Sequence, residues 1–363
     1  VGVGRITLKA TTTATYNTAV GDAALDVNTT GSDNVGVGAD ALGQNTEGGS
    51  NVALGAYALD ASTTGSENTA VGTSALSANT TAGNNTAVGR MALRVNTTGA
   101  SNTALGHQAM ISNTTAANNT AVGKDSLSAN TTGASNTAVG KNAGAAITTG
   151  SNNTMVGIYA GEATTLGISN PFIGRDAGYS NTVGSYNQIV GQASRPASAS
   201  STYAMGLGYN ISCAANYTTF GINSSDIRAA HGSTSWATVS DERYKKDIVD
   251  STAGLSFVNA LKPRTFKYKN LGELPNTFNA YEEGSTEVFK NSNTNHGFIA
   301  QEVKAAIDAD ASIKDGFRLW DDREDGSQEV AESALIPVLV KAIQELSTKN
   351  DALEARLTAL ENA

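Results

Sequence analysis

Apolar and polar residues recur along positions 1–208 with a fixed 17-residue period. Each unit opens on an asparagine, has Val, Leu or Ile three places later and Gly four places later, and in most units has Leu or Met eight places later. A unit with only two principal apolar side chains cannot bury a core by itself, so neighbouring units must stack on one another. The asparagines stand, without a slip of register, at 17, 34, 51, 68, 85, 102, 119, 136, 153, 170 and 187.

The residue types within the unit favour β-structure. Glycine and Asn-Thr-Thr-Gly at this density would break a helix, whereas short Thr and Val segments between glycine-containing turns are typical of one coil of a β-solenoid or β-roll. Residues 1–208 are therefore predicted to form a mainly β solenoid shaft whose coils lie about 4.8 Å apart. The asparagine column is expected to form an amide ladder, and the Val and Leu columns a narrow apolar spine. Because that spine is thin, identical shafts are expected to associate.

The period fades in residues 209–239, where aromatic side chains gather. Exposed aromatic residues make good contacts at little entropic cost, so this segment is a candidate receptor-binding tip. A second role for it is to cap the open end of the solenoid, which a repeat array requires, and one segment can do both. The candidate tip residues are Tyr209, Tyr217, Phe220 and Trp236.

Residues 240–330 are more charged than the repeats and have no period. Their pattern predicts an amphipathic helix over 252–261, which ends before Pro263, and an alternating strand at 264–269. An apolar strand from 296 is expected to lead into a helix that continues through 307. This segment is predicted to be a small α+β region.

Residues 333–363 form the clearest helical pattern, an unbroken a/d seam of apolar residues spaced by three and four. The seam predicts a parallel coiled coil, with Asn350 as a residue that sets the register. Ile at a with Leu at d favours two strands by the general rule, whereas the shaft and the family resemblance below call for three. The seam residues are Ile336, Leu339, Ile343, Leu346, Asn350, Leu353, Leu357 and Leu360.

Charge and hydropathy exclude two classes of partner. The 363 residues carry a net charge of −9, and residues 1–239 hold 9 basic and 11 acidic side chains. A near-neutral shaft before an acidic remainder argues against nucleic-acid binding. No apolar run approaches the roughly 18 to 20 residues that span a bilayer, so no membrane insertion is expected. The sequence starts in mid-repeat without a Met or a signal peptide, and we expect it to be part of a longer protein.

No cofactor or metal is expected. Cys213 stands alone and cannot form an intrachain disulfide. The three histidines, His107, His231 and His296, show no spacing typical of metal ligands.

The boundary between the repeats and the charged region carries the candidate chemistry. A serine, Ser240, is followed five residues later by Lys245, which is a pattern that can supply a nucleophile and its base. The same serine stands before two acidic residues and also fits an ordinary helix N-cap. The local sequence leaves both interpretations open.

Two resemblances narrow the choice. The Asn-Thr-Ala-Val-Gly-x-x-Ala-Leu units resemble the head repeats of trimeric autotransporter adhesins, which form trimeric left-handed β-rolls. The motifs at 240–245 (Ser-Asp-Glu-Arg-Tyr-Lys), 261–263 (Leu-Lys-Pro) and 297–303 (Gly-Phe-Ile-Ala-Gln-Glu-Val), followed by a coiled coil, resemble the endosialidase-type intramolecular chaperone of phage tail spikes and fibres. That resemblance covers residues 240–363.

The second resemblance implies a trimeric folding clamp that assembles the fibre and then cuts itself off with a serine-lysine dyad. Carried over by position, Ser240 is the nucleophile, Lys245 is the base, and the bond between Val239 and Ser240 is cleaved. Tyr244 stands where a leucine is commoner, and a second lysine follows, so either lysine can be the base. The possible supporting residues are Glu242, Lys246, His296, Gln301 and Glu302.

These observations predict the distal, receptor-binding part of a phage tail fibre, which is assembled in the host cytoplasm and becomes part of the virion. The expected partners are two further copies of the chain, a host-surface glycan or protein receptor, and upstream tail or baseplate proteins. One self-cleavage is the only expected activity. The alternatives are the head of a trimeric bacterial adhesin, which needs a C-terminal β anchor, and a glycan-degrading tail spike. The spike needs paired carboxylates, which Asp26, Asp60 and Glu162 do not obviously provide.

Overall fold

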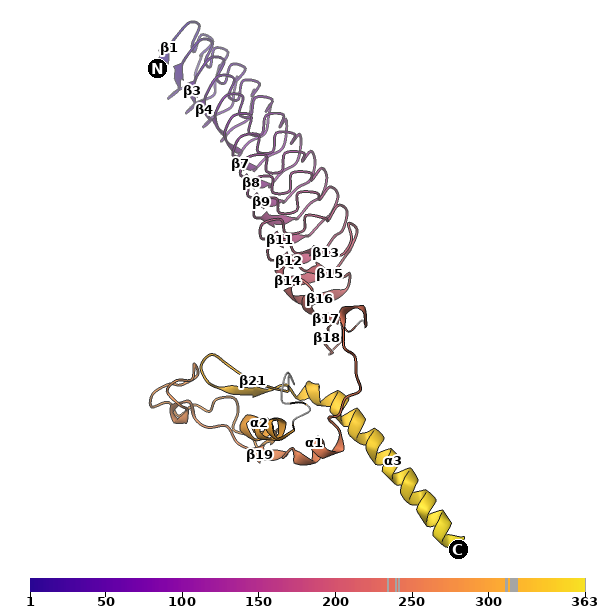
Figure 1. The fold of residues 1–363 in the computed structure, drawn as a ribbon. Coiled ribbons are helices and arrows are strands. Elements are labelled where there is room, and N and C mark those ends of the chain that lie inside the picture. The colour runs from indigo at the N-terminus through magenta and orange to yellow at the C-terminus, as the bar shows by residue number, and fades with distance from the viewer. Residues whose placement is uncertain (234, 239, 241, 311–312, 314–318, 363) are drawn as a thin grey trace. The chain divides into compact units, whose positions relative to one another are not determined.

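Each 17-residue repeat forms one short strand, and the strands stack in parallel along the first part of the chain (Figure 1). The structure is a computed structural model that describes residues 1–233, 235–238, 240, 242–310, 313 and 319–362. The chain divides into two units, Val1–Asp241 and Glu242–Ala363. None of the described helices is both long and apolar enough to cross a membrane.

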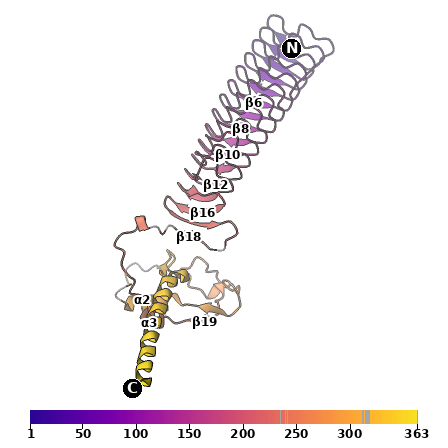
Figure 2. The same cartoon turned by 90° about the vertical axis from the view of Figure 1, so that its right-hand side faces the viewer.

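A 16-stranded sheet runs through the first unit, and the strands of successive repeats pair in register (Figure 2). The predicted β-solenoid of 17-residue coils is confirmed. Its repeat strands are β1 (Gly2–Val3), β2 (Thr18–Val20), β3 (Val35–Val37), β4 (Val52–Leu54), β5 (Thr69–Val71), β6 (Thr86–Val88), β7 (Thr103–Leu105), β8 (Thr120–Val122), β9 (Thr137–Val139), β10 (Thr154–Val156), β11 (Pro171–Ile173) and β12 (Gln188–Val190).

The last coils depart from the period. The strand β14 (Met205–Tyr209) pairs in parallel with both β12 and β16 (Tyr217–Ile222), but Met205 lies opposite Thr218, so this coil is shorter than the regular repeat. β17 (Ser225–Ala230) and β18 (Ala237–Thr238) then continue the sheet in antiparallel fashion. A second parallel pair, β13 (Arg195–Pro196) and β15 (Ser212–Cys213), forms in the same coils.

The core of the shaft is built from alanine and leucine. If the asparagine is position 1 of each coil, the buried columns are the alanines at positions 3 and 8 and the leucines at position 9, as in Ala19, Ala24 and Leu25. The predicted Leu column is therefore part of the spine. The predicted Val column, at position 4, is not: it lies on the outer face, where Leu105 is 46% exposed and Val190 is 40% exposed. Successive residues of a strand point to opposite faces, so the inward alanine at position 3 turns position 4 outward.

Asparagine side chains connect successive coils inside the shaft. In the predicted column at position 1, the backbone N–H of Asn34 donates to Asn17 Oδ1 (2.9 Å), and Asn34 Nδ2 donates to the carbonyl of Gly48 (2.8 Å). A second buried column at position 12 was not anticipated, and there the amides bond directly, for example Asn113 Nδ2 to Asn96 Oδ1 (2.8 Å). These bonds satisfy buried backbone and amide groups that the small apolar core leaves inside.

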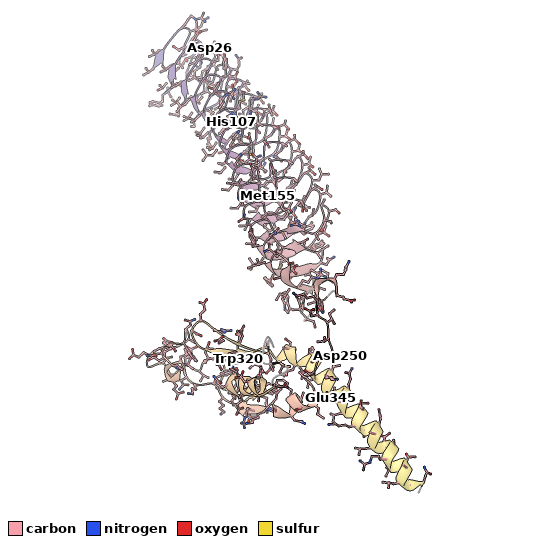
Figure 3. The ribbon with its side chains drawn as sticks, in the orientation of Figure 1. Asp26, His107, Met155, Asp250, Trp320 and Glu345 are labelled. Carbon is pink, nitrogen blue, oxygen red and sulfur yellow. The ribbon has the colours of Figure 1, made fainter. Side chains whose placement is uncertain are left out.

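Core volume shifts between columns in two coils that lack the leucine. Gly161 and Gly178 replace the leucine at position 9, and the alanine at position 3 is there enlarged to Met155 and Phe172. A Cβ at Gly178 would overlap the Phe172 ring. Figure 3 labels Met155 within the shaft.

The backbone repeats one turn that only glycine allows, at position 5. Gly106 has φ +143°, and a Cβ there would lie 2.6 Å from the carbonyl carbon of Gly123 in the next coil. This close approach of the coils explains why the sequence has glycine at this place in each repeat.

The second unit has three α-helices and two small antiparallel sheets of two strands among its described residues. Its buried cluster includes Phe257, Val303, Leu335 and Val338. The helices are α1 (Leu255–Ala260), α2 (Ala300–Ala309) and α3 (Leu335–Glu361), with 3-10 turns η1 (Glu242–Tyr244), η2 (Leu271–Glu273) and η3 (Glu332–Ala334). The strands are β19 (Arg264–Phe266), which pairs with β20 (Asn295–Gly297), and β21 (Trp320–Asp322), which pairs with β22 (Gln328–Val330).

Candidate functional site

The predicted dyad lies at the junction of the two units. Ser240 is exposed at the end of the first unit, and Lys245 is exposed at the start of the second, one residue after η1. The Lys245 backbone N–H donates to the carbonyl of Glu242 (2.9 Å). Val239, on the other side of the predicted scissile bond, and Asp241 lie outside the described residues. The dyad and its cleavage site therefore stay predictions from the sequence.

If Ser240 is a helix N-cap, the helical segment that it caps is short. The only helical segment that directly follows Ser240 in the described residues is η1, a single turn of three residues. No α-helix follows until α1 at Leu255. A capping role at this serine would thus stabilise one short turn, whereas the expected gain from a cap comes with a full helix.

Three of the predicted supporting residues, His296, Gln301 and Glu302, lie in β20 and α2 of the second unit. The other two, Glu242 and Lys246, lie in and just after η1 and are exposed. Arg264 in β19 forms a two-pronged ion pair with Glu302 in α2, with Nε 2.9 Å from Oε2. The hydrogen bond from Arg264 lowers the pKa of Glu302 below its ordinary value. His296 in β20 and Arg264 both line a shallow hollow of about 470 Å³ next to this pair. Gln301 lies exposed at the start of α2.

Sequence reasoning missed two contacts that hold this unit together. Arg264 was not singled out, because its partner Glu302 is 38 residues away. Glu345 in α3 accepts a hydrogen bond from the Leu255 backbone N–H at the start of α1 (2.9 Å), and Figure 3 labels this glutamate on α3. Lys341 stands four residues before Glu345, so the two side chains lie on the same face of α3 and pair there. This local pairing is a sign in the sequence that the Glu345 face of α3 makes contacts.

The aromatic residues of the predicted tip belong to the last strands of the solenoid. The Phe220 and Trp236 rings lie 5.3 Å apart at 40°, and the Arg228 guanidinium lies over the Tyr217 ring at 5.3 Å. Tyr209 ends β14 and is exposed. Three of these aromatic rings contact another ring or a cation on the last coils, as residues that cap the solenoid would. Part of their surface is still exposed, as binding to a receptor would require.

Two apolar surfaces of the described residues are largely exposed. The first is the apolar stripe, the column at position 4 that runs from Val20 along the shaft to Val190, then Leu207 and Phe220. The second is the α3 seam, formed by the a/d residues named above, in which Ile343 is 64% and Leu357 is 57% exposed. α3 packs on its own unit through different residues, Leu335, Val338 and Ala342. Because the seam is a separate face of α3, it remains available for other chains.

No metal site is evident among the residues that the structure describes, in the sense that no three His, Cys, Asp or Glu side chains come together to hold an ion.

Comparison with known proteins yields one finding. A family model described as "Chaperone of endosialidase" matches residues 240–311, a segment that starts at Ser240 and includes α1, β19, β20 and α2. No curated protein and no solved structure matches the chain. Residues 240–311 are thus similar to the endosialidase chaperone, and a β-solenoid shaft precedes them in the same chain.

Proposed function

We propose that this chain is the distal part of a phage tail fibre, and that residues 240–363 are a chaperone that trimerises the fibre and is then removed by cleavage between Val239 and Ser240. The observation that carries the proposal is the chaperone match, which starts at Ser240 directly behind the repeat shaft. The host-surface receptor and the upstream tail or baseplate proteins remain the expected partners.

Trimerisation is supported by the two free apolar surfaces. A core of alanine and leucine is thin, and the apolar stripe leaves one valine, leucine or isoleucine per coil in water. Burial of an exposed side chain of this size contributes on the order of 1 kcal/mol, and the stripe repeats over more than ten coils. The α3 seam would hold the C-terminal ends of the three chains together in the same complex.

The cleavage step is an acyl transfer. Ser240 Oγ attacks the carbonyl carbon of Val239, the hydroxyl proton passes to the lysine amine, and the C–N bond breaks as the Ser240 nitrogen takes up that proton. Water then hydrolyses the ester, which leaves a carboxylate on Val239 and restores the Ser240 hydroxyl. A lysine acts as a base near neutral pH only where the site is dry. Association of three chaperone regions would supply that environment, so cleavage would follow assembly.

Removal of the chaperone would make assembly irreversible. A shaft of parallel coils from three chains nucleates slowly, because the contacts and the register between separate chains are non-local. Once the C-terminal region is lost, the shaft could unfold but not easily refold, and its persistence would be set by its unfolding rate.

The test is mass spectrometry of the purified protein under native and denaturing conditions. Wild type is expected as a trimer of chains that end at Val239, whereas Ser240→Ala should give a trimer of full-length chains. Ser251→Ala is the matched control, because this exposed serine lies outside the dyad, and it should be cleaved like wild type. Lys245→Ala and Lys246→Ala identify the base. Cleavage at the same bond in Ser240→Ala would exclude the dyad.

A further inference from the structure

Positive charge in the shaft is concentrated in one column. At position 6 of successive coils stand Arg90, His107, Lys124, Lys141, Ile158 and Arg175. We call Arg90, Lys124, Lys141 and Arg175 the cationic column, and His107 stands between its first two members. The side chains of Lys124 and Arg175 are 58% and 64% exposed, and Figure 3 labels His107 on the shaft. By contrast, residues 10–89 contain seven acidic side chains and no basic one.

The fold does not require these cations. Earlier coils have Ala39, Ala56 and Thr73 at the same position and keep the same strand register. Lys124 and Lys141 stand in neighbouring coils about 4.8 Å apart, and two like charges at that distance repel by about 1 kcal/mol even in bulk water. The column therefore costs stability, and the shaft would be easier to fold with alanine there.

Contacts within the chain offset only part of this cost. Lys124 Nζ lies 3.6 Å from the Asp125 carboxylate, and Arg175 Nε lies 3.1 Å from the Asp176 carboxylate. Exposed ion pairs of this kind contribute little. Arg90 contacts the ring of His107 in the next coil, with Nη1 3.4 Å from Nε2. A surface that repeats exposed cations without a structural need for them is a candidate site for a repeating anion.

We propose that the cationic column binds a linear acidic polysaccharide. The regular spacing matches a polymer that presents one kind of anion repeatedly. An aromatic ring lies beside the column, at position 7: Lys141 Nζ lies 5.4 Å from the centre of the Tyr159 ring and 3.2 Å from its hydroxyl. Aromatic side chains give a sugar an apolar face together with a polar edge.

The same surface disfavours nucleic acid. Asp125 and Asp176 lie between the cations and would repel a densely charged phosphate backbone. A polysaccharide with about one charge per sugar meets less of this repulsion. The column is also separated from the apolar stripe by the glycine turn at position 5, for example Gly123 with φ +132°, so association of the shafts and binding of the glycan use different side chains.

The inference names a receptor class for the proposed fibre, and it rests on that proposed function for its biological role. The test measures binding of the full protein to immobilised polygalacturonate, neutral dextran and double-stranded DNA at increasing salt. We expect binding to polygalacturonate that weakens with salt and no binding to dextran. The triple variant Arg90→Gln, Lys124→Gln, Lys141→Gln should bind at least about tenfold more weakly.

The matched control removes the same charge elsewhere on the shaft, with Lys9→Gln, Arg94→Gln and Arg195→Gln, and should bind within about twofold of wild type. Absence of polygalacturonate binding, an equal loss in both variants, or DNA binding as tight as polygalacturonate binding would each overturn the inference. Mass spectrometry of the same samples separates the two proposals. A cleaved trimer that ignores polygalacturonate refutes the glycan site alone, and an uncleaved monomer that binds it refutes the proposed fibre chaperone alone.

Discussion

The exchange of core volume between positions 3 and 9 predicts a strong coupling between Phe172 and Gly178. Most coils pair a small residue with a large one, such as Ala121 with Leu127, whereas this coil pairs a large ring with glycine. Gly178→Leu recreates the usual leucine, and its φ of +68° is no obstacle because Leu127 has φ +49°. The added side chain, however, would overlap the Phe172 ring, so the variant should be destabilised by overpacking.

The expected losses of stability follow from the side-chain volume that each substitution removes from or adds to the core. Phe172 is fully buried, and Phe172→Ala should cost about 3–5 kcal/mol because it leaves a cavity. Gly178→Leu alone should cost about 1–3 kcal/mol or more. The double variant recreates the Ala-Leu pair of Ala121 and Leu127 and should recover most of both losses, which is a favourable coupling of about 3 kcal/mol or more. The rescue should be incomplete, because Phe172 also fills the space over Gly161.

The assay uses the single cysteine of the chain. Cys213 is buried, and burial raises the pKa of its thiol to about 11, so a folded shaft should resist alkylation near pH 8. Denaturant unfolding of the four proteins, followed by Cys213 labelling and circular dichroism, gives the free energies for the cycle. If the double variant is as unstable as the sum of the single variants, the two positions do not share one volume and the reasoning is wrong.

Three further predictions concern charge, the amide column and the helix seam. Burial raises the pKa of Asp60, so the folded state binds extra protons and stability falls as the pH rises through that pKa. Asp60→Asn should raise the unfolding midpoint at pH 7 and leave it unchanged at pH 3, and an equal effect at both values would contradict this. Asn113→Ala removes the amide hydrogen bonds that join Asn113 to Asn96 and Asn130 in the coils on both sides, and should cost about 1–3 kcal/mol in denaturant unfolding. Thr115→Ala, at an exposed position, is its control, and similar losses in both would argue against the amide ladder. Leu353→Asp in the α3 seam should reduce the trimer seen by native mass spectrometry, whereas Ala355→Asp, outside the seam, should not; trimers in both would show that α3 is not the clamp.

The shaft could be predicted from sequence because its period survives every coil. A 17-residue period with glycine and asparagine at fixed places has few physical solutions, and the observed register of β2 to β12 follows it. The error over the Val column has a clear cause. Valine is more apolar than alanine, so hydropathy ranks it as core, but the cross-section has room for one large residue per coil, and the leucine of position 9 already occupies it.

The candidate site was less accessible to sequence reasoning. Ser240 and Lys245 could be found because they are five residues apart in one motif. Arg264 and Glu302 could not, because their ion pair joins β19 to α2 across a long polar segment and no local period links them. The second asparagine column was hidden for a different reason: residues in Asn-Thr-Thr-Gly stretches read as turns, and only the coil geometry shows that Asn28 and Asn45 point inward.

The uniformity of the shaft also explains what a separate chaperone would contribute. The apolar stripe presents nearly the same residue in each coil, so three shafts that slide past one another by one coil, about 4.8 Å, lose little contact. Such a surface gives affinity between chains but fixes no axial alignment. The α3 seam is different, because a single asparagine, Asn350, interrupts its apolar residues and a slipped register would bury that amide against leucine. Alignment set at the C-terminus would therefore propagate into a shaft that cannot align itself, and once the coils are in place the aligning region has no further structural role.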